Sequence, residues 1–267
     1  MTIEVRNLRF DALIPKYWHG GRRSVSTFLD GLSIFFPAGE RFFINSVLAH
    51  EKCVKDPELL AQMRAFVAQE ALHTREHLRY NARLRAHGYP VDAMERRVIK
   101  LLDRVTRILP PRLQLGVTCA LEHFTAVMGQ MVLADPRILD GADETMAALW
   151  RWHSIEENEH RSVAFDVFKA AGGTYPERAI TMFGVSVVFW AKVFEHQARL
   201  MHADGTSASP KEWADLGIHL FVTPGGMTKL IGPYFAYYRP SFHPSERGAE
   251  PLLDTYRTAL ANFEAAA

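Results

Sequence analysis

Residues 66–73 read Phe-Val-Ala-Gln-Glu-Ala-Leu-His, and residues 153–160 read His-Ser-Ile-Glu-Glu-Asn-Glu-His. Each stretch holds the pattern Glu-x-x-His, as Glu70 with His73 and as Glu157 with His160. Residues three apart on a helix lie side by side on its surface. A carboxylate and an imidazole in this relation can bind one metal ion together, because both are ligands of divalent transition metals. The two motifs therefore predict two metal-binding helices.

Both motifs sit in the middle of an otherwise apolar helical stripe. Steps of three and four residues keep side chains on one face of a helix. Around the first motif that face carries Leu59, Met63, Phe66, Glu70, His73, His77, Tyr80 and Leu84. Around the second it carries Met146, Trp150, His153, Glu157, His160, Ala164, Val167 and Ala171. A solvent-facing stripe would not begin and end with apolar residues, so the ionisable side chains are predicted to point into the core.

Two further predicted helices each offer a single glutamate on an apolar stripe, Glu40 and Glu122. The chain order is then Glu, Glu-x-x-His, Glu, Glu-x-x-His, which is the ligand pattern of di-iron and di-manganese carboxylate helix bundles. Four buried carboxylates would repel one another and would be costly to desolvate. Two divalent cations would cancel their charge. The alternative is that the motifs face the surface and that the lone glutamates are satisfied core carboxylates.

Several neighbouring residues are weaker candidates. His153 lies one turn before Glu157 and is a candidate seventh ligand, with a packed histidine as the alternative. His77 lies one turn past His73 and is a less favoured ligand. Glu156 and Glu159 could orient a ligand, but solvated surface is the favoured interpretation. His123 is expected at a surface or interface, and Cys119 is expected to be a small packing residue.

Composition sets few limits on function. The 267 residues carry a formal net charge of +1, so nothing points to nucleic acid as a partner. Two cysteines without a CxxC pair fit a reducing cytoplasm. The N-terminus lacks the apolar stretch of a signal peptide. The apolar run Ala179–Ala191 is shorter than the roughly 20 residues that span a bilayer, so no transmembrane segment is expected. A buried helix is the favoured interpretation of the run, and a membrane-contacting helix is the lesser alternative.

The expected organisation is all-α, with a ferritin-like four-helix bundle core and additional C-terminal helices. Residues 1–36 are expected to be irregular, 37–171 to form the di-metal bundle core, and 172–267 to pack on it as further helices. Pro37 suits a first helical turn, and Asp56 with Pro57 suits an N-cap and the position after it. The other helices are expected over residues 57–86, 91–108, 111–133, 143–171 and 176–201.

These motifs resemble known families. Residues 37–171 are similar to the ferritin-like di-iron carboxylate superfamily. The whole chain resembles the bacterial family catalogued as predicted metal-dependent hydrolases, through Glu40-Arg-Phe-Phe, Asp56-Pro57, residues 66–73, His77 and Tyr80-Asn81. The second motif, His-x-x-x-Glu-x-x-His with His153, is also similar to that of arylamine N-oxygenases.

The resemblance implies that two metal ions, iron first and manganese or zinc as alternatives, activate O2 to oxidise or oxygenate a small hydrophobic substrate. The implied ligands are Glu40, Glu70, His73, Glu122, His153, Glu157 and His160. An electron donor of unknown identity would be a partner, and a homodimer is possible. A hydrolase using the same two-metal site is the first alternative, and non-enzymatic iron storage or metal binding is the second.

Overall fold

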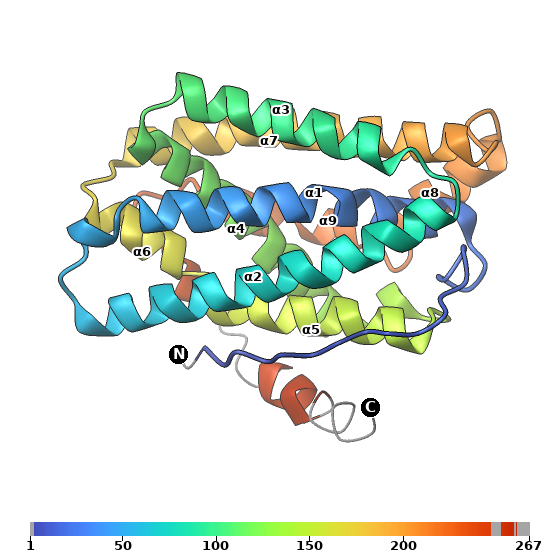
Figure 1. The fold of residues 1–267 in the computed structure, drawn as a ribbon, viewed down its shortest axis with the longest axis horizontal. Coiled ribbons are helices and arrows are strands. Elements are labelled where there is room, and N and C mark those ends of the chain that lie inside the picture. The colour runs from blue at the N-terminus through green and yellow to red at the C-terminus, as the bar shows by residue number, and fades with distance from the viewer. Residues whose placement is uncertain (1–2, 247–251, 259, 261–267) are drawn as a thin grey trace.

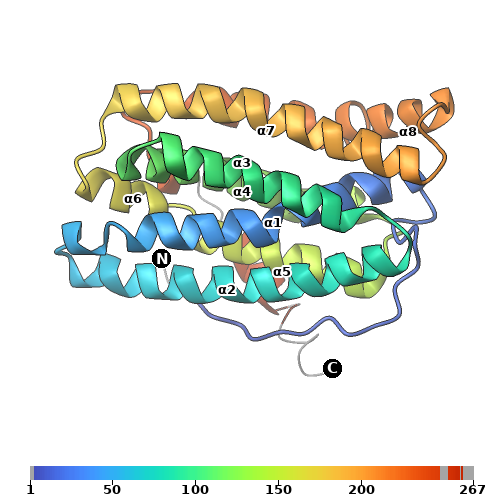
Figure 2. The same ribbon diagram turned by 45° about the horizontal axis from the view of Figure 1, so that its top comes forward.

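The computed structural model describes residues 3–246, 252–258 and 260. Within those residues the chain forms helices and no strand, so the prediction of an all-α fold is confirmed. The helices form an elongated stack (Figure 1, Figure 2). In both views α3 (Val91–Ile108) and α7 (Tyr175–Ala203) lie along one side of α1 (Arg23–Leu48) and α4 (Pro111–Ala134). On the other side lie α2 (Pro57–Ala86) and α5 (Glu144–His160).

Four of these helices pack directly on one another and position the candidate site. Helix α1 packs along α2, α4 packs along α5, and cross-contacts join α1 to α4 and α2 to α5. The start of α2 is as predicted, because the Asp56 side chain accepts a hydrogen bond from the Glu58 backbone N–H at 2.9 Å and Pro57 follows it. The 30-residue α2 therefore carries its Glu-x-x-His motif near the middle of the stack.

The expectation that residues up to 36 are irregular is wrong for its second half. Helix α1 begins at Arg23, and Pro37 lies inside it. A proline in a helix cannot donate to the carbonyl four residues earlier, which here belongs to Ser33. That carbonyl accepts a hydrogen bond from the Asn81 side chain of α2 at 3.4 Å instead. A tertiary contact thus replaces the lost helical bond, and no local pattern could have predicted it.

The helix expected over residues 143–171 is interrupted. Helix α5 ends at His160, and α6 (Val163–Ala170) follows after a short turn. In a continuous helix the Asn158 carbonyl would accept from the backbone N–H of Ser162. It accepts from the Arg161 guanidinium instead, so the break leaves this carbonyl satisfied. The second Glu-x-x-His motif is therefore the last turn of its helix.

The remaining described elements are shorter. Helices α8 (Pro210–Phe221), α9 (Gly226–Lys229) and α10 (Ile231–Ala236) follow α7, and residues 252–258 are helical. Short 3-10 turns are η1 (Glu51–Cys53), η2 (Pro136–Leu139) and η3 (Pro244–Glu246). The buried apolar residues form clusters on both sides of the ionisable centre, so the centre lies inside the hydrophobic core.

The prediction that the run Ala179–Ala191 is a buried helix is wrong. The run lies in α7, where the exposed fractions of Ile180, Phe183 and Val187 are 71%, 65% and 58%. By length and composition α4 and α7 are both apolar enough to span a membrane, but the apolar window of α4 is 61% buried and that of α7 only 28%. Helix α4 is thus a core helix, whereas α7 presents an uncovered apolar face.

Candidate metal centre

Four helices bring the predicted Glu and His residues together in the core. Helix α1 supplies Glu40, α4 supplies Glu122, and α2 and α5 supply one Glu-x-x-His motif each. All are buried. Within the described residues, their ligating atoms form overlapping groups in which all atoms lie within 4.8 Å of one another. These groups are Glu40 with His73 and His153, Glu70 with His73 and Glu157, and Glu70 with Glu122 and His160.

The atoms that face the centre lack hydrogen-bond partners. Both carboxylate oxygens of Glu70 and of Glu122 are unpaired, and His160 Nε2 lies 3.2 Å from Glu70 Oε1 without forming a hydrogen bond. The other unpaired atoms are Glu40 Oε1, Glu157 Oε2 and His73 Nδ1. Buried polar atoms are normally paired, and each unpaired one costs free energy. Carboxylate oxygens and imidazole nitrogens converging in this way fit divalent metal ions.

Electrostatics support the same interpretation. Burial raises the pKa of Glu40 and Glu70 well above the ordinary value, and the neighbouring carboxylates raise it further. Burial and Glu157 raise the pKa of Glu122 to about 7. Without cations, burial and repulsion therefore favour the neutral form of these three carboxyl groups. Cations would remove both the desolvation penalty and the mutual repulsion.

Residues adjacent to the ligands fix the orientation of the ligands. Glu156 Oε2 lies 3.0 Å from His73 Nε2, and Gln69 Oε1 lies 2.9 Å from His160 Nδ1. The other nitrogen of each imidazole therefore faces the centre, as in most protein metal sites. Thr74 donates to Glu40 Oε2 at 2.7 Å.

The expectation of solvated side chains at Glu156 and Glu159 is wrong. Both are buried, because the N-terminal segment from residue 3 to residue 11 runs along α2 and α5 and covers them (Figure 1). The Arg6 guanidinium donates to both oxygens of Glu159 at 2.9 Å, and the ring of Phe10 lies 5.4 Å from that of Trp152. Arg6 and Gln69 were missed in the sequence, because their partners are distant in the chain and no spacing marks them.

His153 and His77 form a hydrogen-bonded chain beside the centre. His153 Nε2 lies 2.8 Å from Glu157 Oε1, and its Nδ1 lies 2.7 Å from His77 Nε2. His77 Nδ1 in turn lies 2.9 Å from Ser33 Oγ. Burial would raise the pKa of Glu157, but the hydrogen bond with His153 and the nearby His160 imidazole hold it well below the ordinary value. Both nitrogens of each ring thus have hydrogen-bond partners, and His153 would have to exchange one of them to bind a metal ion. The assignment of His153 as a seventh ligand therefore stays a prediction.

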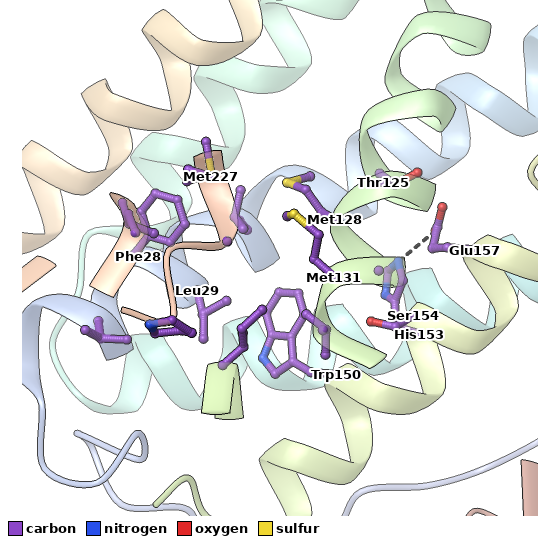
Figure 3. A pocket seen from close by; sticks show the side chains of 18 of the residues that line it. Phe28, Leu29, Thr125, Met128, Met131, Trp150, His153, Ser154, Glu157 and Met227 are labelled. Atoms are coloured by element: carbon purple, nitrogen blue, oxygen red, sulfur yellow. Dashed lines mark hydrogen bonds and ion pairs between the residues drawn. The ribbon is translucent and has the colours of Figure 1, made fainter. Parts of the chain in front are cut away.

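A cavity of about 100 Å³ adjoins this side of the centre (Figure 3). His153 and Glu157 form its inner end, and Thr125 and Ser154 add the nearest hydroxyl groups. The rest of the wall is almost wholly apolar and includes Phe28, Leu29, Met128, Met131, Trp150 and Met227. An apolar molecule with one polar group could place that group next to Glu157.

Two other sequence candidates lie outside the centre. His123, expected at a surface or interface, is buried within the chain, and its Nε2 lies 3.1 Å from the Pro233 carbonyl oxygen. Cys119 is buried among apolar side chains, as expected for a packing residue, and burial raises the pKa of its thiol. Neither belongs to the groups of candidate ligands.

An all-α chain whose core gathers buried glutamates and histidines from four helices defines a metal-binding helical protein. Comparison with protein families then identifies the family of the chain. The chain belongs to the family described as "Predicted metal-dependent hydrolase", whose model matches residues 4–248. No curated protein and no solved structure matches the chain.

Proposed function

We propose that this protein is a metal-dependent hydrolase that cleaves an ester-type bond in a hydrophobic substrate. The observation that carries the proposal is the set of unpaired carboxylate and imidazole atoms beside an apolar cavity. The proposed ligands are Glu40, Glu70, His73, Glu122, Glu157 and His160. The family description supports hydrolysis as the reaction.

Bound divalent ions would supply a water molecule of lowered pKa and stabilise negative charge on the substrate oxygen. The protein's own residues hold the ligands and the substrate. Glu156 and Gln69 orient the two motif histidines, and the apolar wall excludes bulk water from the cavity. His153 lines the cavity beside Glu157, and its Nε2, 2.8 Å from Glu157 Oε1, helps to hold that ligand in place. Water and ester would yield a carboxylic acid and an alcohol.

Oxidation by O2 is the second candidate. The donor set of four carboxylates and two histidines, all buried in a helical core, supports it, because this is the donor set of di-iron carboxylate bundles. The apolar cavity also suits an oxidisable hydrocarbon. This candidate needs ferrous ions and a reductant, whereas hydrolysis needs neither.

The two candidate activities can be distinguished by the metal ion that supports them and by their requirement for O2. Protein loaded anaerobically with Zn²⁺ or Mn²⁺ should hydrolyse p-nitrophenyl alkanoate esters, and Glu70→Ala should abolish the activity. A Zn²⁺ form inactive on a broad ester and phosphoester panel would overturn the proposal. Ferrous protein that consumes O2 and develops a new absorption band would then support oxidation. Metal analysis should give about two ions per chain, and many ions per chain would indicate storage instead.

A further inference from the structure

A second and larger cavity, of about 540 Å³, lies between helices. Helix α3 packs on α1, and α7 packs on α1 and α4, and residues of both α3 and α7 border the open space. Both helices lie on the same side of α1 and α4 (Figure 2). The cavity is thus a groove with α1 and α4 as its floor and α3 and α7 as its walls.

The floor on α4 is a continuous apolar stripe. Leu113, Val117, Leu121, Thr125 and Met128 follow one another at steps of four, four, four and three, so they share one face of the helix. A stripe that faces a packed neighbour is normally buried. Here Leu121, Thr125 and Met128 are only partly buried, because they border open space. The stripe therefore offers apolar surface to a ligand along the length of the groove.

The groove adjoins the cavity beside the metal centre, because four side chains border both spaces. Leu32, Phe36, Thr125 and Met128 line both. At the outer side, Ile180, Gly184 and Val188 of α7 line the groove and are exposed, so the groove opens on the uncovered face of α7. An elongated molecule that reached from the surface to the residues next to Glu157 would pass between these four side chains.

The groove offers little polar recognition. Its charged lining residues are Glu177 and Lys192, and both already have partners, Arg112 at 2.6 Å and Glu195 at 2.6 Å. The volume lies within the range of roughly 300–1,000 Å³ that ligand pockets span. Recognition must therefore come from buried apolar area, which suits a flexible hydrocarbon chain better than a compact polar molecule.

We propose that the groove binds the long alkyl chain of the substrate, so that the substrate class is a long-chain acyl ester. This inference rests on the proposed hydrolase function. The chain would lie along the α4 stripe, and its ester end would pass Phe36 and Thr125 into the cavity beside Glu157.

Binding of n-alkanols of increasing length to the metal-loaded full chain tests the groove without any catalysis. Calorimetry should show affinity rising about fourfold for each added methylene until the groove is filled, because each buried methylene contributes about 0.8 kcal/mol. Affinity that does not depend on chain length would overturn the proposal.

A substitution that fills the groove tests the same proposal, and a substitution outside the groove is its control. A side chain at Gly184 would meet no other atom within 4 Å at its Cβ, so Gly184→Phe can be accommodated and would occupy the groove. Gly217→Phe on α8 is the control, because Gly217 is equally open and lines neither cavity. We expect Gly184→Phe to lower the affinity for long alkanols at least tenfold. Gly217→Phe should leave that affinity unchanged. Equal affinities for the two variants would contradict the proposal.

The two proposals fail in different ways. Chain-length-dependent binding by protein that hydrolyses no ester would leave the groove assignment intact and refute the hydrolase. Hydrolysis of short and long esters at equal rates, with no binding of alkanols, would refute only the groove assignment.

Discussion

The two sides of the metal centre differ in what lies behind the ligands. Towards the N-terminal segment, Glu156, Glu159, Gln69 and Arg6 form a buried, hydrogen-bonded layer that touches both motif histidines. Towards α4 and α7, apolar side chains border open space. The polar side holds the ligands in place, and the open side is where a substrate can approach. The difference teaches that one buried centre can combine hydrogen-bonded support for its ligands on one side with open space for a substrate on the other.

Removing ligands shared by both sides should have the largest effect. The double variant Glu70→Ala with Glu157→Ala removes carboxylates that reach the middle of the centre, so metal content should fall from about two ions per chain to none. Elemental analysis measures this. Glu58→Ala with Glu144→Ala is the matched control, because these glutamates are exposed on the same two helices. Unchanged metal content in the ligand variant would refute the assignment.

Breaking the polar side at Arg6 should cost stability. Arg6→Met leaves Glu159 buried with Arg257 as its remaining cation, so the free energy of unfolding should fall by about 3 kcal/mol. Chemical denaturation measures the loss. The exposed pair of Arg112 with Glu177 is the comparison, and Arg112→Met should cost under about 1 kcal/mol. Equal losses would show that the N-terminal segment does not brace the centre.

Loosening one histidine should weaken metal binding without abolishing it. Gln69→Leu removes the amide that fixes His160 Nδ1, so metal affinity should fall roughly 10- to 100-fold. Competition with a chelator measures the change. Gln62→Leu, two turns earlier on α2, is the control, because the Gln62 amide donates to Glu58 near the surface. If Gln69→Leu leaves the metal affinity unchanged, His160 does not need the hydrogen bond with Gln69 to bind metal.

The smallest effect is expected on the open side. Thr125→Val keeps the size of the side chain and removes a hydroxyl that donates to the Glu122 carbonyl oxygen at 3.1 Å. Metal content should not change, and stability should change by less than about 1 kcal/mol. Loss of metal in this variant would show that the open side also supports the ligands.

The candidate ligands were predictable because they follow helical spacing. Glu70 with His73 and Glu157 with His160 need only the three-residue step, and the apolar stripes around them indicate burial. The start of α2 followed from Asp56 and Pro57 for the same local reason. These features depend on residues close together in the sequence.

The features that were missed depend on distant partners. Helix α1 begins at Arg23 and continues through Pro37, and the Ser33 carbonyl that Pro37 leaves without a helical donor accepts from Asn81 of α2. The burial of Glu156 and Glu159 requires the N-terminal segment to cross α5, and its residues show no pattern of their own. The exposed face of α7 was missed because an apolar run indicates burial without showing whether any element covers it.

Pro37 also determines how α1 is aligned along α2. Ser33 is tied to Asn81 twice, by its hydroxyl at 2.9 Å and by its carbonyl at 3.4 Å, and the carbonyl is available because a proline follows four residues later. Two turns further along, Glu40 meets Thr74. A shift of one residue would slide α1 by about 1.5 Å and carry Glu40 away from its place in the centre. A residue that ordinarily ends helices here sets the longitudinal register between two of them.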